Sequence, residues 1–281
     1  MKQRTPNATR LKAKINDFAK SNSLASQVVL QNYMFECLLK RISMSQYSKN
    51  FVLKGGLLIS SIVGLNIRTT MDMDTTILHL PLEESLIRTV MNDIFALLNE
   101  DDVSFELVSL ESIRDNDIYG GFCVHINASY ESIVTPLSVD ITTGDSIYPA
   151  VTEAFFKKLF ETGFIKTLAY PIENILAEKM ETILVRGTFN SRPRDFYDVH
   201  VLTSTVKYDK ATFMQALLRT AEHRGTRSVV ENESVERLAV IENSDDVKRQ
   251  WSRYQARFPY AKAVAFEEVI ASVRKLMTVN P

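Results

Sequence analysis

The sequence predicts an α+β protein with a mixed sheet in its first half and a mainly helical region after it. Short alternating apolar stretches follow one another closely between residues 71 and 141, which favours an antiparallel or mixed sheet. From Pro171 onward the apolar residues recur at helical spacing instead. We therefore divide the chain near residue 168, into a first domain, 1–168, with N-terminal helices, and a helical C-terminal domain, 169–281.

The elements of the first domain follow from the spacing of its apolar residues. A polar start runs through Ser23, and the glycine pair Gly55-Gly56 suggests a short loop that feeds a helix ending at Gly64. In order, the predicted elements are helix Leu24–Ile42, helix Leu57–Val63, strand Met71–Leu80, helix Leu82–Asn99, and strands Val103–Leu110, Phe122–Ala128 and Leu137–Ile141.

The second domain is predicted to consist of helices. Pro171 suits the first turn of a helix that runs to Val185, and Gly187 is a suitable stop. The further helices are expected at Arg194–Leu202, Lys210–His223, Ser234–Ile241, Val247–Phe258 and Phe266–Met277.

The composition is that of an ordinary globular protein. The 281 residues are 45% hydrophobic and 24% charged with a net charge of −1, which excludes a uniformly basic nucleic-acid coat protein but leaves room for a local basic groove. No apolar run approaches the ~18 residues that span a bilayer. The start of the chain, Met1–Pro6, lacks the apolar core of a signal peptide. We expect a cytoplasmic protein with no membrane partner.

Two aspartates on one predicted strand are the first candidate site. Asp72 and Asp74 are two residues apart, so both carboxylates leave the same face of the strand, and Met71 and Met73 should point into the core. Like charges side by side repel unless a cation lies between them, and Mg²⁺ prefers carboxylate and phosphate oxygens. A solvated strand face is the alternative for so short a motif.

A third carboxylate can join this pair. In Leu137–Ile141 the apolar residues share one face, and Ser138 and Asp140 share the other. If this strand lies beside the first, the three aspartates can hold one or two metal ions. Upstream, Gly55 and Gly56 should allow close backbone approach and offer free N–H groups to phosphate at a helix start. Lys54 either adds positive charge there or is a solvated surface lysine.

A lysine on an apolar helix face is the second candidate. At ~100° per residue, Lys179 falls within the stripe formed by Ile175, Leu176 and Ile183. A lysine in that position either extends to solvent or meets an anion.

Asp195 and Asp198, three apart on the next predicted helix, can supply that anion. One of them pairs with the lysine in this interpretation, and the other faces a substrate. Arg192 and Arg194 precede them and can contact phosphates. A buried Lys–Asp bridge that only orients two helices is the alternative.

The remaining candidates are read as structural. The cysteines Cys37 and Cys123 are expected to be small buried hydrophobic residues, and Tyr197 and Trp251 core aromatics. The histidines have no metal-ligand spacing and are expected to be packed or surface residues; they are His79, His125, His200 and His223.

Four motifs in order resemble the AbiEii toxins of type IV toxin–antitoxin systems. They are Lys54-Gly55-Gly56 followed by Asp72-Met73-Asp74; Val139-Asp140-Ile141 with Gly144-Asp145; Tyr170 to Lys179, YPIENILAEK; and Arg194 to Val199, RDFYDV. The resemblance covers roughly residues 50 to 205. Gly56 stands where many nucleotidyltransferases carry a serine, so backbone rather than hydroxyl contacts to phosphate are expected.

The resemblance implies a polymerase-β-like nucleotidyltransferase core whose active-site cleft is completed by the helical domain. It implies an enzyme of the EC 2.7.7 type that uses Mg²⁺, as one or two ions, and a nucleoside triphosphate, either GTP or another. Asp72, Asp74 and Asp140 would hold metal and act in catalysis with Lys179 and Asp198. The residues that would contact the nucleotide are Lys54, Gly55, Gly56, Lys179, Arg194 and Asp195.

The resemblance also implies a biological setting. The related mycobacterial MenT toxins transfer nucleotides to tRNA, so the acceptor is expected to be the 3′ end of an RNA, in an abortive-infection system that acts in phage defence. A cognate AbiEi-like antitoxin is implied as partner. Transfer to a protein hydroxyl, or a non-catalytic module that binds GTP or RNA, are the alternatives.

Overall fold

The computed structural model describes residues 6–98, 100–113 and 120–278, and the chain divides into two compact units. Unit 1 comprises Met1–Asp145 and Thr152–Ala169, and unit 2 comprises Ser146–Val151 and Tyr170–Pro281. Asn99, where one predicted helix ends, and Met1–Thr5, which the signal-peptide argument used, lie outside the described residues.

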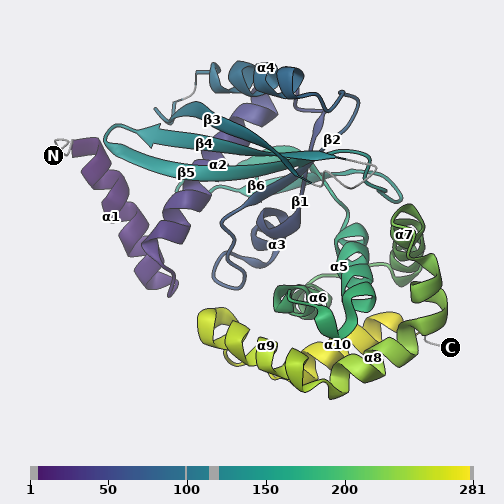
Figure 1. Cartoon of the computed structure of the whole chain (residues 1–281). Coiled ribbons are helices and arrows are strands. Elements are labelled where there is room, and N and C mark those ends of the chain that lie inside the picture. Colours follow the sequence, from purple (N-terminus) through teal and green to yellow (C-terminus); the bar gives the residue numbers. More distant parts are fainter. Residues whose placement is uncertain (1–5, 99, 114–119, 279–281) are drawn as a thin grey trace. The chain divides into compact units, whose positions relative to one another are not determined.

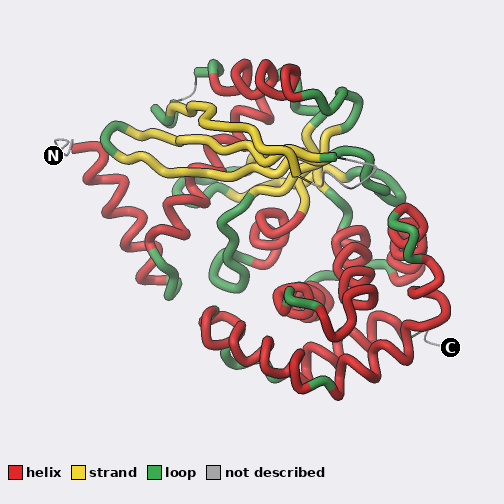
Figure 2. Tube along the Cα trace, in the orientation of Figure 1, coloured by secondary structure: helices red, strands yellow, loops and turns green. Residues whose placement is uncertain are grey.

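Unit 1 is built on one mixed sheet (Figures 1 and 2). Its described strands are β1 Phe51–Lys54, β2 Met73–Ile77, β3 Ser104–Ile113, β4 Gly121–Tyr130, β5 Ile133–Thr142, β6 Thr152–Lys157 and β7 Phe164–Ala169. They are ordered β3-β4-β5-β2-β1-β7-β6. β2 runs parallel to β5 and antiparallel to β1, and β1 runs parallel to β7. The predicted α+β class and mixed sheet are therefore confirmed.

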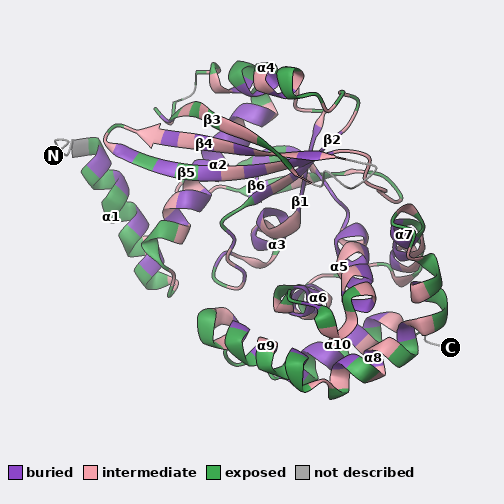
Figure 3. Cartoon of the chain, viewed as in Figure 1, coloured by how far each residue is buried: buried purple, intermediate pink, exposed green. Residues whose placement is uncertain are grey.

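Helices pack on this sheet. Those of unit 1 are α1 Pro6–Ser21, α2 Ser26–Met44, α3 Gly55–Val63 and α4 Glu84–Phe95. α2 contacts β5, β7 and α4, whereas α4 contacts β3 and α3 contacts β1 and β2 (Figure 1). Buried positions alternate with half-buried ones along β4, and with half-buried or exposed ones along β5 (Figure 3). Each of these strands therefore packs one face into the core and leaves the other face open.

Three strands of unit 1 and its first helix were not predicted. All four residues of β1 are buried, so this strand shows no alternation. β6 and β7 form one edge of the sheet, and β6 buries little of its surface. α1 lies in the polar start, where its few buried residues, Ala8, Leu11, Ile15 and Ala19, give a narrow apolar stripe.

A buried carboxylate joins α2 to the turn between β6 and β7. Glu36 is 6% exposed, and its Oε2 accepts the Leu159 N–H at 2.7 Å. Burial raises the pKa of Glu36 from 4.5 to about 7, and the hydrogen bond from Leu159 opposes the shift. The folded chain therefore holds a proton on Glu36 that the unfolded chain has already released.

This proton makes stability fall as pH rises through the window between the two pKa values. Between pH 4.5 and about 7 the folded state binds more protons than the unfolded state, so the free energy of unfolding decreases with pH. We expect a loss of about 2–3 kcal/mol between pH 4 and pH 8 from this group. Urea unfolding of Glu36→Gln should lack that slope; an identical slope in the variant would contradict the assignment.

Unit 2 is helical. Its described helices are α5 Ile172–Arg186, α6 Pro193–Thr205, α7 Lys210–His223, α8 Ser234–Asn243, α9 Asp245–Arg257 and α10 Phe266–Met277, with shorter turns at Gly187–Phe189, Val229–Glu233 and Pro259–Ala261. Pro171 caps the start of α5 and Gly187, with φ of 54°, ends it. These bounds confirm the predicted mainly helical region, and Tyr197 and Trp251 are core residues, 3% and 2% exposed.

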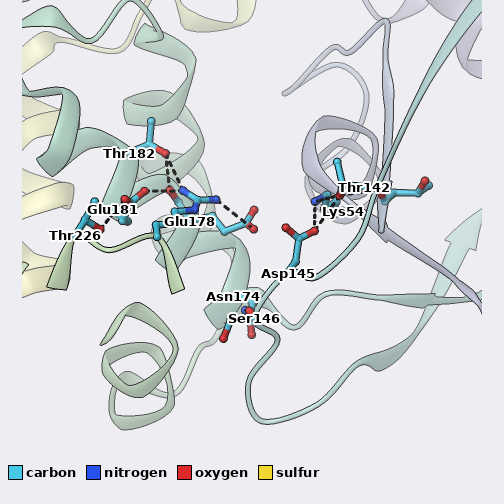
Figure 4. Close-up of polar contacts among 11 residues, drawn as sticks. Lys54, Thr142, Asp145, Ser146, Asn174, Glu178, Glu181, Thr182 and Thr226 are labelled. Carbon is cyan, nitrogen blue, oxygen red and sulfur yellow. Dashed lines mark hydrogen bonds and ion pairs between the residues drawn. The ribbon is translucent and has the colours of Figure 1, made fainter. Parts of the chain in front are cut away.

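Asn174 fixes the short segment 146–151 to α5. This fully buried side chain accepts the Tyr148 N–H at 2.7 Å and donates to the Ser146 carbonyl at 2.8 Å (Figure 4). The side chain thus uses both its acceptor and its donor on one segment of backbone. Across the described part of the chain, no helix combines the length and the apolar character needed to cross a membrane.

Candidate active site

Asp74 and Asp140 are neighbours on adjacent strands. β2 and β5 pair in parallel with Asp74 opposite Asp140, and both residues are half-buried. Their neighbours Met73 and Val139 are fully buried on the other face. Strand alternation therefore directs both carboxylates to the same face of the sheet, on strands ~4.8 Å apart. The predicted approach of Asp140 to the first strand is confirmed.

Asp72 lies just outside the strand. β2 begins at Met73, so the predicted strand Met71–Leu80 is too long and alternation does not apply to Asp72. Met71, predicted to point into the core, is 46% exposed, because the alternating ladder does not extend to it. The backbone of Asp72 instead meets the Thr70 hydroxyl, which lies 3.2 Å from its carbonyl and 3.4 Å from its nitrogen.

Each glycine of the pair makes room for one of these aspartates. Gly55 has φ of +63°, and a Cβ there would lie 1.9 Å from Asp74 Oδ2. A Cβ on Gly56 would lie 2.6 Å from the Thr70 hydroxyl, which holds the backbone of Asp72. A side chain at position 55 would therefore displace Asp74, and one at position 56 would require the Thr70 hydroxyl to move.

The Gly56 amide is already used by the protein. It donates to Asp74 Oδ2 at 3.2 Å, which differs from the expectation of a free N–H group for phosphate. This contact turns the Asp74 carboxylate toward the positive end of α3, where a negative charge is stabilised. The glycine pair thus positions the carboxylate as well as opening the backbone.

Cys123 extends the row across the sheet. It lies opposite Asp140 on β4, and Glu111 of β3 lies opposite Cys123. Burial raises the pKa of the Cys123 thiol to about 12, and its hydrogen bond to Asp140 and the charges of Asp140, Glu111 and Asp72 add to the effect. Cys123 is therefore a protonated neighbour of the carboxylates and only half-buried, whereas Cys37 is buried as predicted.

Lys54 is buried, which excludes the solvated surface lysine as an interpretation. Its Nζ lies 2.5 Å from Asp145 Oδ2 and 2.8 Å from Thr142 Oγ1, and both charged side chains are 8% exposed (Figure 4). Because β2 lies between β1 and β5, this contact crosses over the strand that carries Asp74. Neither Thr142 nor Asp145 was predicted as a partner of Lys54, although Gly144-Asp145 belongs to the second motif.

Replacing Lys54 with methionine should destabilise unit 1. The substitution leaves the Asp145 carboxylate buried without its cation, which costs about 3–5 kcal/mol. Urea unfolding measures the loss. The double variant Lys54→Met with Asp145→Asn should recover most of it, because the uncompensated charge is gone. Equal stability of the single and double variants would show that this ion pair does not hold the strands together.

In unit 2, Lys179 forms an ion pair with each of two aspartates. Its Nζ lies 2.7 Å from Asp195 Oδ1 and 2.9 Å from Asp198 Oδ2. The lysine side chain is 15% exposed, and those of the aspartates are 5% and 0% exposed. The prediction of an anion beside Lys179 is therefore confirmed, but the division of labour is wrong: both aspartates face the lysine, since residues three apart share one side of α6.

Two other polar features border this group. Glu181 of α5 is 4% exposed and accepts from Arg224 at 2.5 Å and from Thr226 at 2.9 Å (Figure 4). Arg192 and Arg194, at the start of α6, are exposed. Arg194 therefore remains available to solutes at a helix N-terminus, a position that favours anions.

The residues of unit 1 suit a divalent metal ion. Asp74 and Asp140 offer only oxygen donors, the ligands that Mg²⁺ prefers, and glycine leaves the space beside Asp74 clear of a Cβ. Within the described ranges, no group of three or more histidine, cysteine, aspartate or glutamate side chains already has the geometry to hold an ion. The donor chemistry therefore fits, with two carboxylates set by the sheet and Asp72 beside them in sequence.

Comparison with protein families identifies the class and then the family. The model that describes the nucleotidyltransferase AbiEii toxin of type IV toxin–antitoxin systems matches residues 37–272. The chain is therefore a nucleotidyltransferase. It belongs to the AbiEii family of toxins, as the four sequence motifs indicated. A search of curated proteins finds no match.

Three solved structures are similar to the chain at low identity. A candidate nucleotidyltransferase from H. pylori is 16% identical, with a TM-score of 0.47 over 90% of this chain and 94% of that one. JHP933 from Helicobacter pylori is 14% identical, with a TM-score of 0.49 over 90% and 91%. An antigenic nucleotidyltransferase-like protein from Paracoccidioides brasiliensis is 12% identical, with a TM-score of 0.33 over 81% and 92%.

Proposed function

We propose that this toxin is a Mg²⁺-dependent enzyme that moves a nucleotide from a nucleoside triphosphate to the 3′ end of an RNA. The observation that carries the proposal is the pairing of Asp74 with Asp140 on one sheet face, next to the glycine-rich start of α3. Two fixed carboxylates on one face suit a cation, and a helix N-terminus suits phosphate. GTP or another nucleoside triphosphate would be the donor.

Asp72, Asp74 and Asp140 are the residues that would hold the metal. Mg²⁺, when bound, would neutralise triphosphate charge and lower the pKa of the attacking hydroxyl. Gly55 and Gly56 would let the phosphates approach the backbone. A phosphate contact by Lys54 would have to displace Asp145. We therefore propose that Lys54 holds the strands in place through this ion pair and does not contact phosphate.

Unit 2 carries the other residues of the proposal, which are Arg194 as a phosphate contact and the ion-paired group of Lys179, Asp195 and Asp198. The two aspartates hold Lys179 through ion pairs of 2.7 and 2.9 Å. In this proposal Lys179 and Asp198 are needed for activity, and Asp195 shares the lysine with Asp198. Because the three charges are buried together, loss of any one also costs stability, so their variants need an unfolding measurement beside the activity assay.

The segment 186–194 of unit 2 supports RNA as the acceptor. Phe189 is 92% exposed, and the segment carries Arg186, Arg192 and Arg194 but no acidic residue. Buried Asn190 fixes the segment, since its Oδ1 accepts the Arg192 N–H at 2.9 Å. An aromatic ring held in solvent among arginines suits single-stranded nucleic acid, whose bases stack and whose phosphates pair with guanidinium.

Replacing Phe189 with alanine should weaken the use of RNA. Loss of one stacked base costs ~1–3 kcal/mol, so KM for RNA should rise by about 5- to 150-fold while KM for the triphosphate stays unchanged. The assay follows transfer from each of four labelled nucleoside triphosphates to total RNA, with and without a chelator. Phe164→Ala, which removes a 62% exposed ring from unit 1, is the control. If the two variants have equal KM values for RNA, Phe189 does not contact the RNA.

As a toxin of this family, the protein implies an antitoxin, and we propose that its cognate partner is AbiEi-like. Nucleoside triphosphates and RNA are cytoplasmic, so the proposed reaction belongs in the cytoplasm. Modification of a host RNA would stop growth, which fits a role in abortive infection and phage defence.

A further inference from the structure

A serine, a histidine and a glutamate from three neighbouring strands lie on the sheet face that carries Asp140. Ser138 of β5 is opposite His125 of β4, with its Oγ 3.3 Å from His125 Nδ1. On the far side of the ring, Nε2 lies 3.4 Å from Glu111 Oε1 of β3. The expectation of a merely packed or surface histidine missed this contact, because its three members come from three strands.

The two ring nitrogens of His125 face different partners. In the tautomer that carries its hydrogen on Nε2, toward the Glu111 carboxylate, Nδ1 has a free lone pair and accepts from the Ser138 hydroxyl. A base oriented by a third group and in contact with a hydroxyl is the arrangement that activates nucleophiles, and such contacts are often long before substrate binds.

The position of Ser138 brings this hydroxyl close to the paired carboxylates. Ser138 and Asp140 are two residues apart on β5 and share its half-buried face, ~7 Å apart along the strand. The surroundings are open to solutes, since the side chains of His125 and Glu111 are 34% and 66% exposed. The proposed function gives no role to Ser138, His125 or Glu111.

We propose that Ser138 is a nucleotide acceptor within the chain, so that the enzyme modifies itself. This inference rests on the proposed function, because it uses the same donor. Ser138 Oγ forms a bond to the α-phosphorus of the nucleoside triphosphate, the bond from that phosphorus to the bridging oxygen breaks, and pyrophosphate leaves with the electron pair. The hydroxyl proton goes to His125 Nδ1, and Glu111 stabilises the resulting imidazolium.

Self-modification would also regulate the toxin. A hydroxyl held beside the donor reacts at a high effective concentration, whereas RNA has to be bound from solution. A nucleotide on Ser138 adds a phosphodiester charge two residues from Asp140. Like charge and bulk there should lower transfer to RNA, so the modified chain is the restrained form of the enzyme.

Intact-mass spectrometry and peptide mapping of the full chain test the inference. After incubation with Mg²⁺ and each nucleoside triphosphate, we expect a gain of one nucleoside monophosphate group on Ser138. Ser138→Ala should abolish the gain, Ser138→Thr should keep it, and His125→Gln should slow it by ~10²-fold. Ser109→Ala is the matched control, because Ser109 is the other residue opposite His125. Thermal unfolding confirms that each variant is folded.

The outcomes separate this inference from the function beneath it. Labelled RNA with an unmodified protein overturns self-modification and leaves the proposed function standing. A mass gain that persists in Ser138→Ala also overturns it. Modified Ser138 without labelled RNA supports it and replaces RNA as the acceptor. If neither molecule gains nucleotide, the proposed function fails and the self-modification fails with it.

Discussion

Replacing Asp74 with asparagine should lower nucleotide transfer by on the order of 10³-fold, the scale of losing one preorganised charge-stabilising group. Asparagine keeps the shape of the side chain and an oxygen that can accept from the Gly56 amide, 3.2 Å away. It removes the negative charge that, in the proposed function, would hold a cation together with Asp140. The measurement is the rate of labelled-nucleotide incorporation, read beside growth arrest in cells that express the variant.

The matched control for this variant is Asp17→Asn, which changes an exposed aspartate of α1 in the same unit. We expect it to keep the wild-type rate. Asp72→Asn should lower the transfer rate to a similar extent as Asp74→Asn, because the family motif pairs the two residues. If Asp74→Asn incorporates nucleotide within tenfold of the wild type, the paired carboxylates are not the catalytic centre and the proposed function is wrong.

Replacing Gly55 with alanine should be nearly as damaging, although it adds a single methyl group. The Cβ would lie 1.9 Å from Asp74 Oδ2, so the carboxylate has to move. A displacement of ~1 Å at a reacting centre can cost ~10²-fold in rate. The positive φ of +63° adds about 1–2 kcal/mol of backbone strain. Both the transfer rate and the urea midpoint should therefore fall.

Gly225→Ala separates these two causes. Gly225 has φ of +68°, close to that of Gly55, but a Cβ there meets nothing within 4 Å. It should lose stability through strain alone and keep full activity. Gly56→Ala should affect Asp72 through Thr70, whose hydroxyl lies 2.6 Å from the added carbon. A Gly55→Ala enzyme as active as Gly225→Ala would mean that Asp74 tolerates displacement.

The periodicity of apolar residues predicted those site residues that lie on a strand or helix with one buried face and one open face. The alternation of Leu137–Ile141 assigned Asp140 to the open face, and burial of Val139 bears this out. Helical spacing placed Lys179 among apolar residues, where it had either to extend to solvent or to meet an anion, and two aspartates pair with it. In both cases a local pattern reflects a single physical demand, the burial of apolar surface.

Contacts between distant residues could not be predicted in this way. Lys54 meets Asp145, 91 residues further along the chain, and a local pattern contains no trace of that pairing. The burial of Met71 was predicted wrongly because alternation was extended to residues that precede the start of β2. The need for glycine at 55 follows from the position of Asp74, which is close in space but 19 residues away in the sequence.

Under the proposed function, the pairing of β2 on both edges would set an order for the arrival of substrates. β2 is held between β1 and β5, so the carboxylates of Asp74 and Asp140 are kept close together by the sheet itself. Two carboxylates fixed side by side would repel a bare triphosphate, whereas a triphosphate that already carries its divalent ion would arrive largely neutralised. Nucleotide affinity would then depend on the concentration of the divalent ion.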